Sequence, residues 1–182
     1  MPFSVSTFRT AGIAQGGARP NLFDVQFTNA GGGSTVGTPL MTYLCKIASI
    51  PPSTMGVVEV PYFGRMVKVP GNRTFDNLSL TVINDEGFEL RNDVEKWMNK
   101  MNSHVSNTSE QPQGLLAEVV VQHYTRDQKP AGGSGGSKWT FIGAFPVALG
   151  EIALDWSSND TIEEFTIDLA YDYWTHAGQV TA

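Results

Sequence analysis

Carboxylates are the most frequent ionisable side chains near the end of this chain. No Lys or Arg follows Lys138, whereas seven Asp and Glu residues do. Two of them, Glu163 and Glu164, are adjacent, as are Asp85 and Glu86 earlier in the chain. A hydrolase that uses paired carboxylates needs both groups to converge on one bond. Because neighbouring side chains on a strand point to opposite faces, Glu163 and Glu164 do not form such a pair.

A glycine-rich segment, GSGGSK at residues 133–138, superficially resembles a phosphate-binding loop. That motif requires Gly directly before the Lys and Ser or Thr directly after it. Here Ser137 precedes Lys138 and Trp139 follows it, and strand-like segments rather than a helix flank the loop. The segment is interpreted as the tip of a hairpin.

The remaining candidates for chemistry are isolated. His104, His123 and His176 are far apart and lack the spacing of metal ligands. The single Cys45 excludes an internal disulfide and is expected to be a buried, inert thiol. Residues 155–160 indicate a tight turn rather than a cation-binding loop. We therefore expect no catalytic residues, no metal, no cofactor and no enzymatic activity.

The carboxylates do follow a structural pattern. Residues 162–173 alternate between polar and apolar side chains, which predicts one long strand with a wet and a dry face. An acidic face without Lys or Arg suits the wall of an aqueous channel. The wet face comprises Glu164, Thr166, Asp168, Ala170 and Asp172, and the dry face comprises Phe165, Ile167, Leu169, Tyr171 and Tyr173.

Length and charge limit the function classes. A chain of 182 residues predicts one domain, residues 21–176, with an N-terminal arm (1–20) and a C-terminal tail (177–182). The formal net charge of −6 disfavours electrostatic capture of nucleic acid. Residues 1–73 contain six Lys or Arg and two Asp or Glu. Residues 74–182 also contain six Lys or Arg, but sixteen Asp or Glu. This asymmetry favours head-to-tail association of copies, unless the two halves interleave in one fold. No signal peptide or membrane span is recognised, so synthesis inside a cell is expected.

The elements that must position these residues are mostly strands. Strands are predicted at residues 22–27, 41–50, 78–82, 116–125, 139–149 and 151–156, in addition to 162–173. Residues 57–60 and 66–69 predict a hairpin whose turn is supplied by Gly64, with Glu59 opposite Lys68. One helix is expected after an N-cap at Asn84 or Asp85. Its buried stripe is Leu90, Val94, Trp97, Met98 and Met101, and Arg91 and Glu95 pair on its exposed side.

Several ordered motifs resemble the tail tube proteins of T-even-type contractile phages. They are VEVPYFGR (58–65), GNRTF (71–75), NDEGFELR (84–91), VEKWMN (94–99) and DWSSNDTIEEF (155–165). The resemblance spans roughly residues 20–175, and the glycine-rich tips at 31–33 and 131–137 look like local insertions.

The resemblance implies a mostly-β fold, a β-sandwich or partly open barrel with one flanking α-helix. It implies hexameric rings in which the sheets of neighbouring subunits form one continuous barrel, and rings that stack into a tube. The implied partners are other copies of the chain, the sheath, the tape-measure protein, and the baseplate and neck or terminator proteins. Genomic DNA would pass through without specific binding, since an acidic wall repels phosphates. The implied location is the virion, without direct membrane insertion.

Three groups of residues are assigned roles on this basis. The hairpin residues are expected to contact other subunits or rings: Glu59, Tyr62, Phe63, Gly64 and Arg65. The acidic residues Glu164, Asp168 and Asp172 are expected to face the lumen, with a contact between rings as the alternative. Glu86, Glu89 and Asp93 are expected to meet the sheath.

Two other functions fit the sequence. One is the tube subunit of a phage-derived injection device, either type VI secretion-like or extracellular. The other is a monomeric β-barrel module that binds a small ligand inside.

Overall fold

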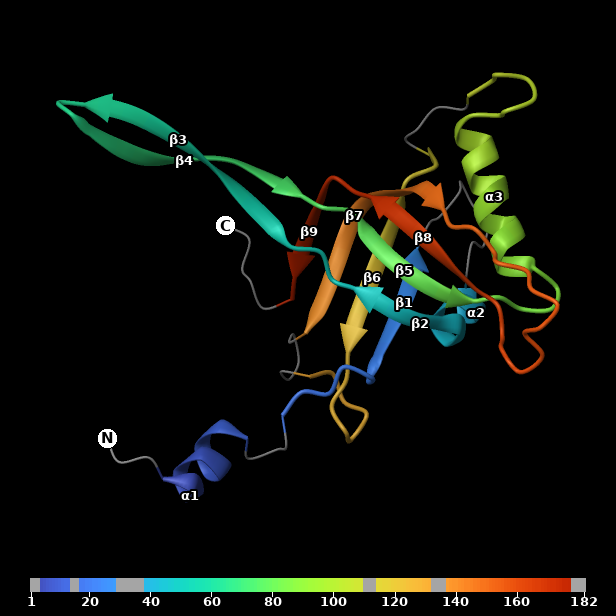
Figure 1. Cartoon of the computed structure of the whole chain (residues 1–182), viewed down its shortest axis with the longest axis horizontal. Coiled ribbons are helices and arrows are strands. Elements are labelled where there is room, and N and C mark those ends of the chain that lie inside the picture. Colours follow the sequence, from blue (N-terminus) through green and yellow to red (C-terminus); the bar gives the residue numbers. More distant parts are fainter. Residues whose placement is uncertain (1–3, 14–16, 29–37, 110–113, 132–136, 178–182) are drawn as a thin grey trace.

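A curved antiparallel sheet forms the body of the protein in the computed structural model, which describes residues 4–13, 17–28, 38–109, 114–131 and 137–177 (Figure 1). The strands follow the order β1-β6-β7-β8-β5-β2, and β9 also pairs with β7. Every pairing is antiparallel. The strands are β1 Phe23–Thr28, β2 Cys45–Ser49, β5 Leu78–Ile83, β6 Ala117–His123, β7 Lys138–Leu149, β8 Glu164–Ala170 and β9 Tyr173–His176.

A second sheet and several helices complete the fold. β3 Ser53–Tyr62 and β4 Arg65–Phe75 form a two-stranded hairpin that projects from the body. α3 Glu89–Met101 flanks the sheet, and α2 Thr38–Leu44 connects β1 to β2. α1 Val5–Thr7 and the π-helical turn η1 Phe8–Gly12 lie apart from the sheet. The expectation of a mostly-β domain flanked by a helix is confirmed.

The core lies between the sheet and α3. The alternating strands direct every second side chain inward, as in β5, where Leu78, Leu80 and Val82 are buried. The helix contributes the stripe expected from its sequence, with Leu90, Val94 and Trp97 fully buried. Met98 and Met101 pack at the margin of the same cluster. The other buried members include Val25, Met41, Val119, Phe141, Phe165, Ile167 and Leu169.

The long terminal strand has a kink that its sequence did not predict. β8 ends at Ala170 and β9 begins at Tyr173, although both keep one register against β7: Phe145 is opposite Ala170 and Ile142 is opposite Tyr173. Between these pairs Gly143 has a φ of +71°, which only glycine adopts without strain. The alternation changes here, because Trp174 packs against the core and Tyr173 is exposed. The prediction that Tyr173 lies on the dry face is wrong.

Two other expected strands differ. Residues 41–44, predicted to belong to a strand, form the last part of α2, and only Cys45–Ser49 is extended. Pro39 fits the first turn of this helix, where a missing N–H interrupts no hydrogen bond. Residues 151–156 are not a strand but belong to a loop between β7 and β8, and the tight turn expected at residues 155–160 is present in it.

The helix α3 begins later than the N-cap residues suggested. Asp85 Oδ2 accepts a hydrogen bond from Glu89 N at 3.1 Å, but Phe88, with a φ of +54°, is the residue that precedes the helix. Glu86 therefore lies in the preceding turn and not in the first helical turn. Of the helices within the described residues, none combines the length and apolar character needed to cross a bilayer.

Cys45 is expected to resist alkylation. Burial raises the pKa of its thiol from 9.0 to about 12, and the thiolate is the reactive form. At pH 8 the folded protein should therefore react with iodoacetamide about 100-fold or more slowly than the protein in guanidinium chloride. Mass spectrometry of the modified fraction over time measures both rates, and equal rates would show that the thiol is accessible.

Candidate assembly surfaces

The β3–β4 hairpin continues the β2–β5 ladder beyond the body. Ser49 is opposite Ser79 in that ladder, and Ser53 is opposite Phe75 in the hairpin. Every residue of β3 is exposed, and so is nearly all of β4. One face of the hairpin carries paired valines, with Val58 opposite Val69 and Val60 opposite Val67. An apolar face this exposed is characteristic of a surface that is covered by a partner.

The hairpin tip presents an aromatic pair. A two-residue loop of Phe63 (φ +45°) and Gly64 (φ +73°) joins Tyr62 to Arg65. Both φ values are positive, as in the type I′ turns that suit twisted hairpins. Phe63 is 92 % exposed, and its ring meets that of Tyr62 edge-to-face with centroids 4.7 Å apart. A bulky residue in this backbone conformation is uncommon, which favours a contact role for its ring.

Other hairpin contacts agree with the sequence prediction. Lys68 Nζ lies 3.7 Å from Glu59 Oε1, and these two residues are directly opposite one another. Since both side chains are largely exposed, the pair contributes little to stability. The predicted pair is thus present, and Glu59 remains available to other partners.

Aromatic contacts anchor the base of the hairpin. The Phe75 ring at the end of β4 lies 6.0 Å from Tyr171 and 6.4 Å from Trp174 between centroids. Burial, with a smaller contribution from the Asp76 carboxylate, raises the pKa of Tyr171 to about 12. The hydroxyl therefore stays neutral at physiological pH, and the junction between hairpin and body gains no charge.

The acidic face of β8 carries only part of the charge expected from its sequence. Glu164 is exposed and Asp168 is half-buried, while the buried residues alternate with them as predicted. Lys46 from β2, however, forms an ion pair with Glu164. The expectation of a face without any cation is therefore wrong at this position, because a residue 118 positions away supplies one.

Asp172 lies apart from these two carboxylates. It sits at the kink between β8 and β9, where its N–H donates to Ile142 O at 3.0 Å. Its side chain lies over Gly143, since a Cβ at that glycine would be 2.5 Å from Asp172 Oδ2. The structure thus brings Glu164 and Asp168 onto one regular face and places Asp172 beyond its end.

The three acidic residues expected to meet the sheath lie just before α3 or in its first two turns. Glu86 is exposed in the turn before the helix, and Glu89 is its exposed first residue. Asp93 is half-buried and accepts a hydrogen bond from Lys96 at 3.1 Å. Two of the three carboxylates are therefore exposed at the N-terminal end of α3.

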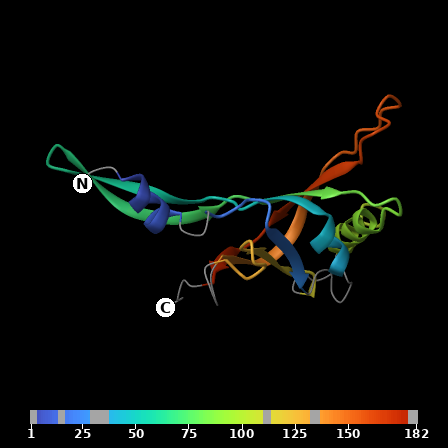
Figure 2. The same cartoon turned by 90° about the horizontal axis from the view of Figure 1, so that it is seen from below.

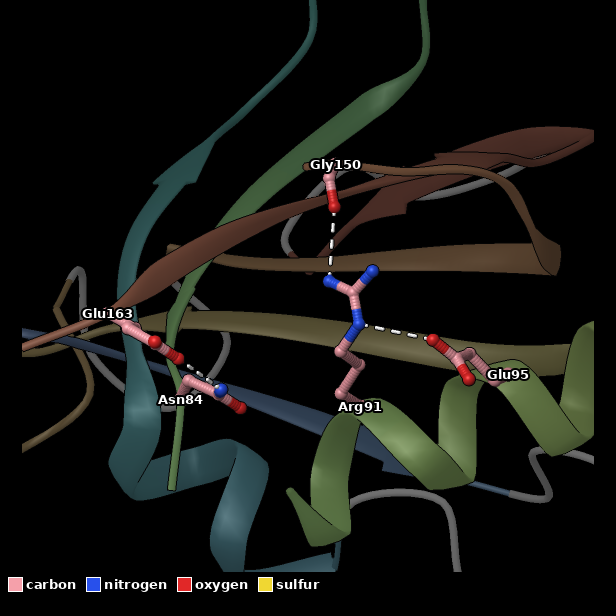
Figure 3. A network of polar contacts seen from close by, with 5 residues as sticks. All are labelled: Asn84, Arg91, Glu95, Gly150 and Glu163. Atoms are coloured by element: carbon pink, nitrogen blue, oxygen red, sulfur yellow. Dashed lines mark hydrogen bonds and ion pairs between the residues drawn. The ribbon is translucent and has the colours of Figure 1, made fainter. Parts of the chain in front are cut away.

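A polar network holds both ends of the β7–β8 loop (Figure 3). Arg91 Nη1 donates to Gly150 O at 3.1 Å and Arg91 Nε to Glu95 at 3.1 Å, and its guanidinium lies 5.4 Å from the Phe165 ring centre. Asn84 Nδ2 donates to Glu163 Oε2 at 3.0 Å at the other end. The Arg91–Glu95 pair was predicted from the sequence, but on the exposed side of the helix. The hydrogen bond from Arg91 to Gly150 was not predicted, because no local sequence pattern indicates a contact with a loop 59 residues away.

Several strands of the body have an unpaired edge within the described residues, and two of these edges, on β2 and on part of β7, bound the run β7-β8-β5-β2. Within the described residues β2 pairs only with β5, on one side. The pairing of β6 with β7 ends where Ala117 is opposite Ala144. Residues 145–149 of β7 therefore pair with β8 alone. Unpaired edges of this kind invite pairing with another chain.

Comparison with known proteins identifies the family. The family model described as "Phage tail tube protein" matches residues 18–177. The chain belongs to this family of tail tube proteins. It is 32 % identical over 158 residues to the tail tube protein gp19 of Enterobacteria phage T4. The aligned region covers 86 % of this chain and 90 % of that protein. The tail tube protein of Serratia phage KSP90 is 33 % identical over 129 residues, 70 % of each chain.

The expected resemblance to T-even-type contractile phages is thereby confirmed, and the chain is a structural tail tube subunit of the virion. Solved structures share the tail tube fold at lower identity. A chain of the anti-feeding prophage baseplate has a TM-score of 0.64 at 17 % identity, covering 87 % of this chain and 94 % of its own length. A chain of the sheath–tube complex of an extracellular contractile injection system has a TM-score of 0.60 at 17 % identity, covering 96 % and 99 %.

The tail tube motifs fall on different parts of this fold. Residues 58–65 form the hairpin tip, residues 84–91 the entry to α3, and residues 155–165 the β7–β8 loop with the start of β8. The glycine-rich segments 31–33 and 132–136 lie outside the described residues. His104, His123 and His176 each have a different neighbour, and no metal-binding group of ligands is found within the described part of the chain.

Proposed function

We propose that this tail tube subunit assembles into hexameric rings, that the rings stack into the inner tube of a contractile tail, and that the role is structural and non-enzymatic. The sheath would surround the tube, the baseplate would nucleate it, and the neck or terminator proteins would cap it. The tape-measure protein and then the genome would occupy the lumen. Relatives named tail tube proteins and fold neighbours in baseplate and sheath–tube complexes support this proposal.

The observation that carries it is the four-strand ladder β7-β8-β5-β2. Its two outer strands have the open edges described above, and all its pairings are antiparallel. Four is an even number, so β2 of one copy runs antiparallel to β7 of the next, and the alternation continues through any number of copies. A closed barrel made in this way covers both of these edges.

The face of this ladder opposite the core would line the lumen. Glu164 and Asp168 project from it, beside the polar Thr166 and Ser79. Asp172 would lie at its margin, near the boundary with the next ring. The hairpin tip, Tyr62 to Arg65 with Glu59, would make contacts between subunits, and Glu86, Glu89 and Asp93 would face the sheath.

Cysteine crosslinking tests the pairing of the two edges. Ile47→Cys on β2 is combined in turn with cysteine at each of positions 145–149 of β7, and assembly is nucleated on baseplates. Disulfide-linked ladders on non-reducing gels support the proposal, with Ile47→Cys plus Val105→Cys as the matched control. Compact 19.8-kDa monomers in the presence of baseplates, seen by negative-stain microscopy, would overturn it.

Reversing the charge of the proposed lumen should slow genome passage. Glu164→Lys with Asp168→Lys is expected to leave assembly intact and to reduce the ejection rate by about tenfold or more, because each Lys that neutralises a phosphate favours DNA binding. Time-resolved release of DNA from purified particles measures the rate. Asp127→Lys, at an exposed position in the turn after β6 that belongs to none of the proposed surfaces, is the control, and unchanged ejection in the β8 variant would remove these residues from the channel.

The two other functions remain distinguishable. The fold neighbours from extracellular injection systems favour that setting as the second candidate. A monomeric ligand-binding module predicts a single small species under every assembly condition.

A further inference from the structure

The β7–β8 loop, residues 151–163, exposes apolar side chains far from the core. Trp156 is fully exposed, and Leu154 and Ile162 are 79 % and 71 % exposed. Free loops usually present polar side chains to water, whereas three large apolar residues on one loop indicate a surface that becomes covered. Trp is also one of the residues enriched among the anchors of protein interfaces.

The loop is constrained at its ends and at its tip. Arg91 and Asn84 hold its two ends, as Figure 3 shows. At the tip, Asp155 accepts hydrogen bonds from Ser157 N at 2.9 Å and from Ser157 Oγ at 2.8 Å. These bonds hold the pKa of Asp155 below its usual value, so the carboxylate that supports the turn is charged at neutral pH. Trp156 is thus presented on a defined turn, which lowers the entropy lost when it binds.

The loop and the hairpin carry opposite charges. Residues 151–163 contain four Asp or Glu and no Lys or Arg. The β3–β4 hairpin contains Arg65, Lys68 and Arg73 against the single Glu59. Both elements also expose apolar side chains, including the paired valines of the hairpin. The two surfaces are therefore complementary in charge and alike in apolar character, as the two sides of a specific interface are.

The two elements leave the body at opposite ends of the molecule. In Figure 1 the hairpin extends to the upper left and the β7–β8 loop to the lower right, and Figure 2 shows the same separation from a second direction. They do not meet within one chain. A contact between them must join two copies, and it is heterologous, because different surfaces of the two copies meet. Heterologous contacts generate rings or open helical stacks.

We propose that in the assembled tube the 151–163 loop of one copy packs against the β3–β4 hairpin of a second copy, with Trp156 as its apolar anchor. This inference rests on the proposed tube. Each copy supplies one loop and one hairpin, so every loop finds a hairpin except at the ends of the assembly.

Photocrosslinking identifies the occupant directly. Trp156→p-benzoylphenylalanine is incorporated into a mixture of isotopically light and heavy chains, tubes are nucleated on baseplates, and crosslinked peptides are mapped by mass spectrometry. The expected products join position 156 to residues 53–75 in mixed light–heavy pairs. Val105→p-benzoylphenylalanine, at an exposed position outside both elements, should not yield them. The inference would be overturned if position 156 crosslinked only within its own chain, only to another surface of the tube or only to the sheath. The absence of any crosslink would overturn it as well.

A charge exchange tests the complementarity. Arg65→Glu with Lys68→Glu, and separately Glu151→Lys with Asp160→Lys, should each raise the concentration required for assembly about tenfold or more. Combining all four substitutions should restore assembly to within about threefold of the wild type. Additive defects would overturn the inference while leaving the tube proposal intact, whereas a wild-type chain that forms no rings or tubes on baseplates would refute the proposed function itself.

Discussion

Replacement of Phe63 by asparagine is expected to block assembly while the monomer stays folded. Phe63 is an exposed aromatic ring on the two-residue turn at the hairpin tip. Loss of an aromatic anchor typically costs about 2–4 kcal/mol of binding free energy, which corresponds to about 30- to 1,000-fold in affinity. The variant creates an Asn-Gly turn, the preferred sequence for the type I′ geometry found here, so the hairpin itself should be as stable as before or more so.

This substitution separates assembly from folding. The concentration needed to form tubes is measured by sedimentation, and the melting temperature of the dilute monomer by circular dichroism. Val105→Asn, at a similarly exposed position after α3, serves as the matched control and should change neither quantity. Assembly of the Phe63 variant at wild-type concentrations would exclude the ring from the interface, and a lower melting temperature would show that it supports the monomer.

The strands of the body were predictable from sequence because burial on one face imposes a period of two. The alternation in residues 78–82 and 165–169 matches the buried residues of β5 and β8. The α3 stripe was predictable for the same reason, with a period of 3.6. The hairpin is longer than its β-branched segments suggested, since pairing extends from Ser53 to Phe75 through residues of weak β propensity.

The misses arise from contacts between distant parts of the chain. The kink before Tyr173 depends on Gly143, and the cation beside Glu164 comes from Lys46. Arg91 has the sequence position of a surface residue, but its guanidinium donates a hydrogen bond to Gly150 O at the start of the β7–β8 loop. Local patterns contain no information on such pairs, and the roles assigned to the hairpin tip came from the family resemblance rather than from any periodicity.

Trp97→Ala is expected to have the largest effect on the stability of the monomer. The Trp97 ring is buried in the core and meets Phe27 edge-to-face at 6.5 Å. Its Nε1 donates to Leu115 O at 2.7 Å, an interaction between buried groups. Removal of the ring leaves a cavity and an unpaired carbonyl, so the free energy of unfolding should fall by about 3–5 kcal/mol. Urea denaturation of the dilute monomer, followed by circular dichroism, measures the loss.

The chain offers a control of the same residue type. Trp156 is fully exposed, and Trp156→Ala should change the free energy of unfolding by less than about 0.5 kcal/mol. Trp97→Phe retains most of the buried surface but loses the hydrogen bond, so its cost should be lower, about 1–3 kcal/mol. If Trp97→Ala lowered the free energy of unfolding no more than Trp156→Ala, packing of the Trp97 ring would not be what stabilises α3 against the sheet. An equal cost for the Ala and Phe variants would instead assign the stabilisation to the hydrogen bond with Leu115 rather than to packing.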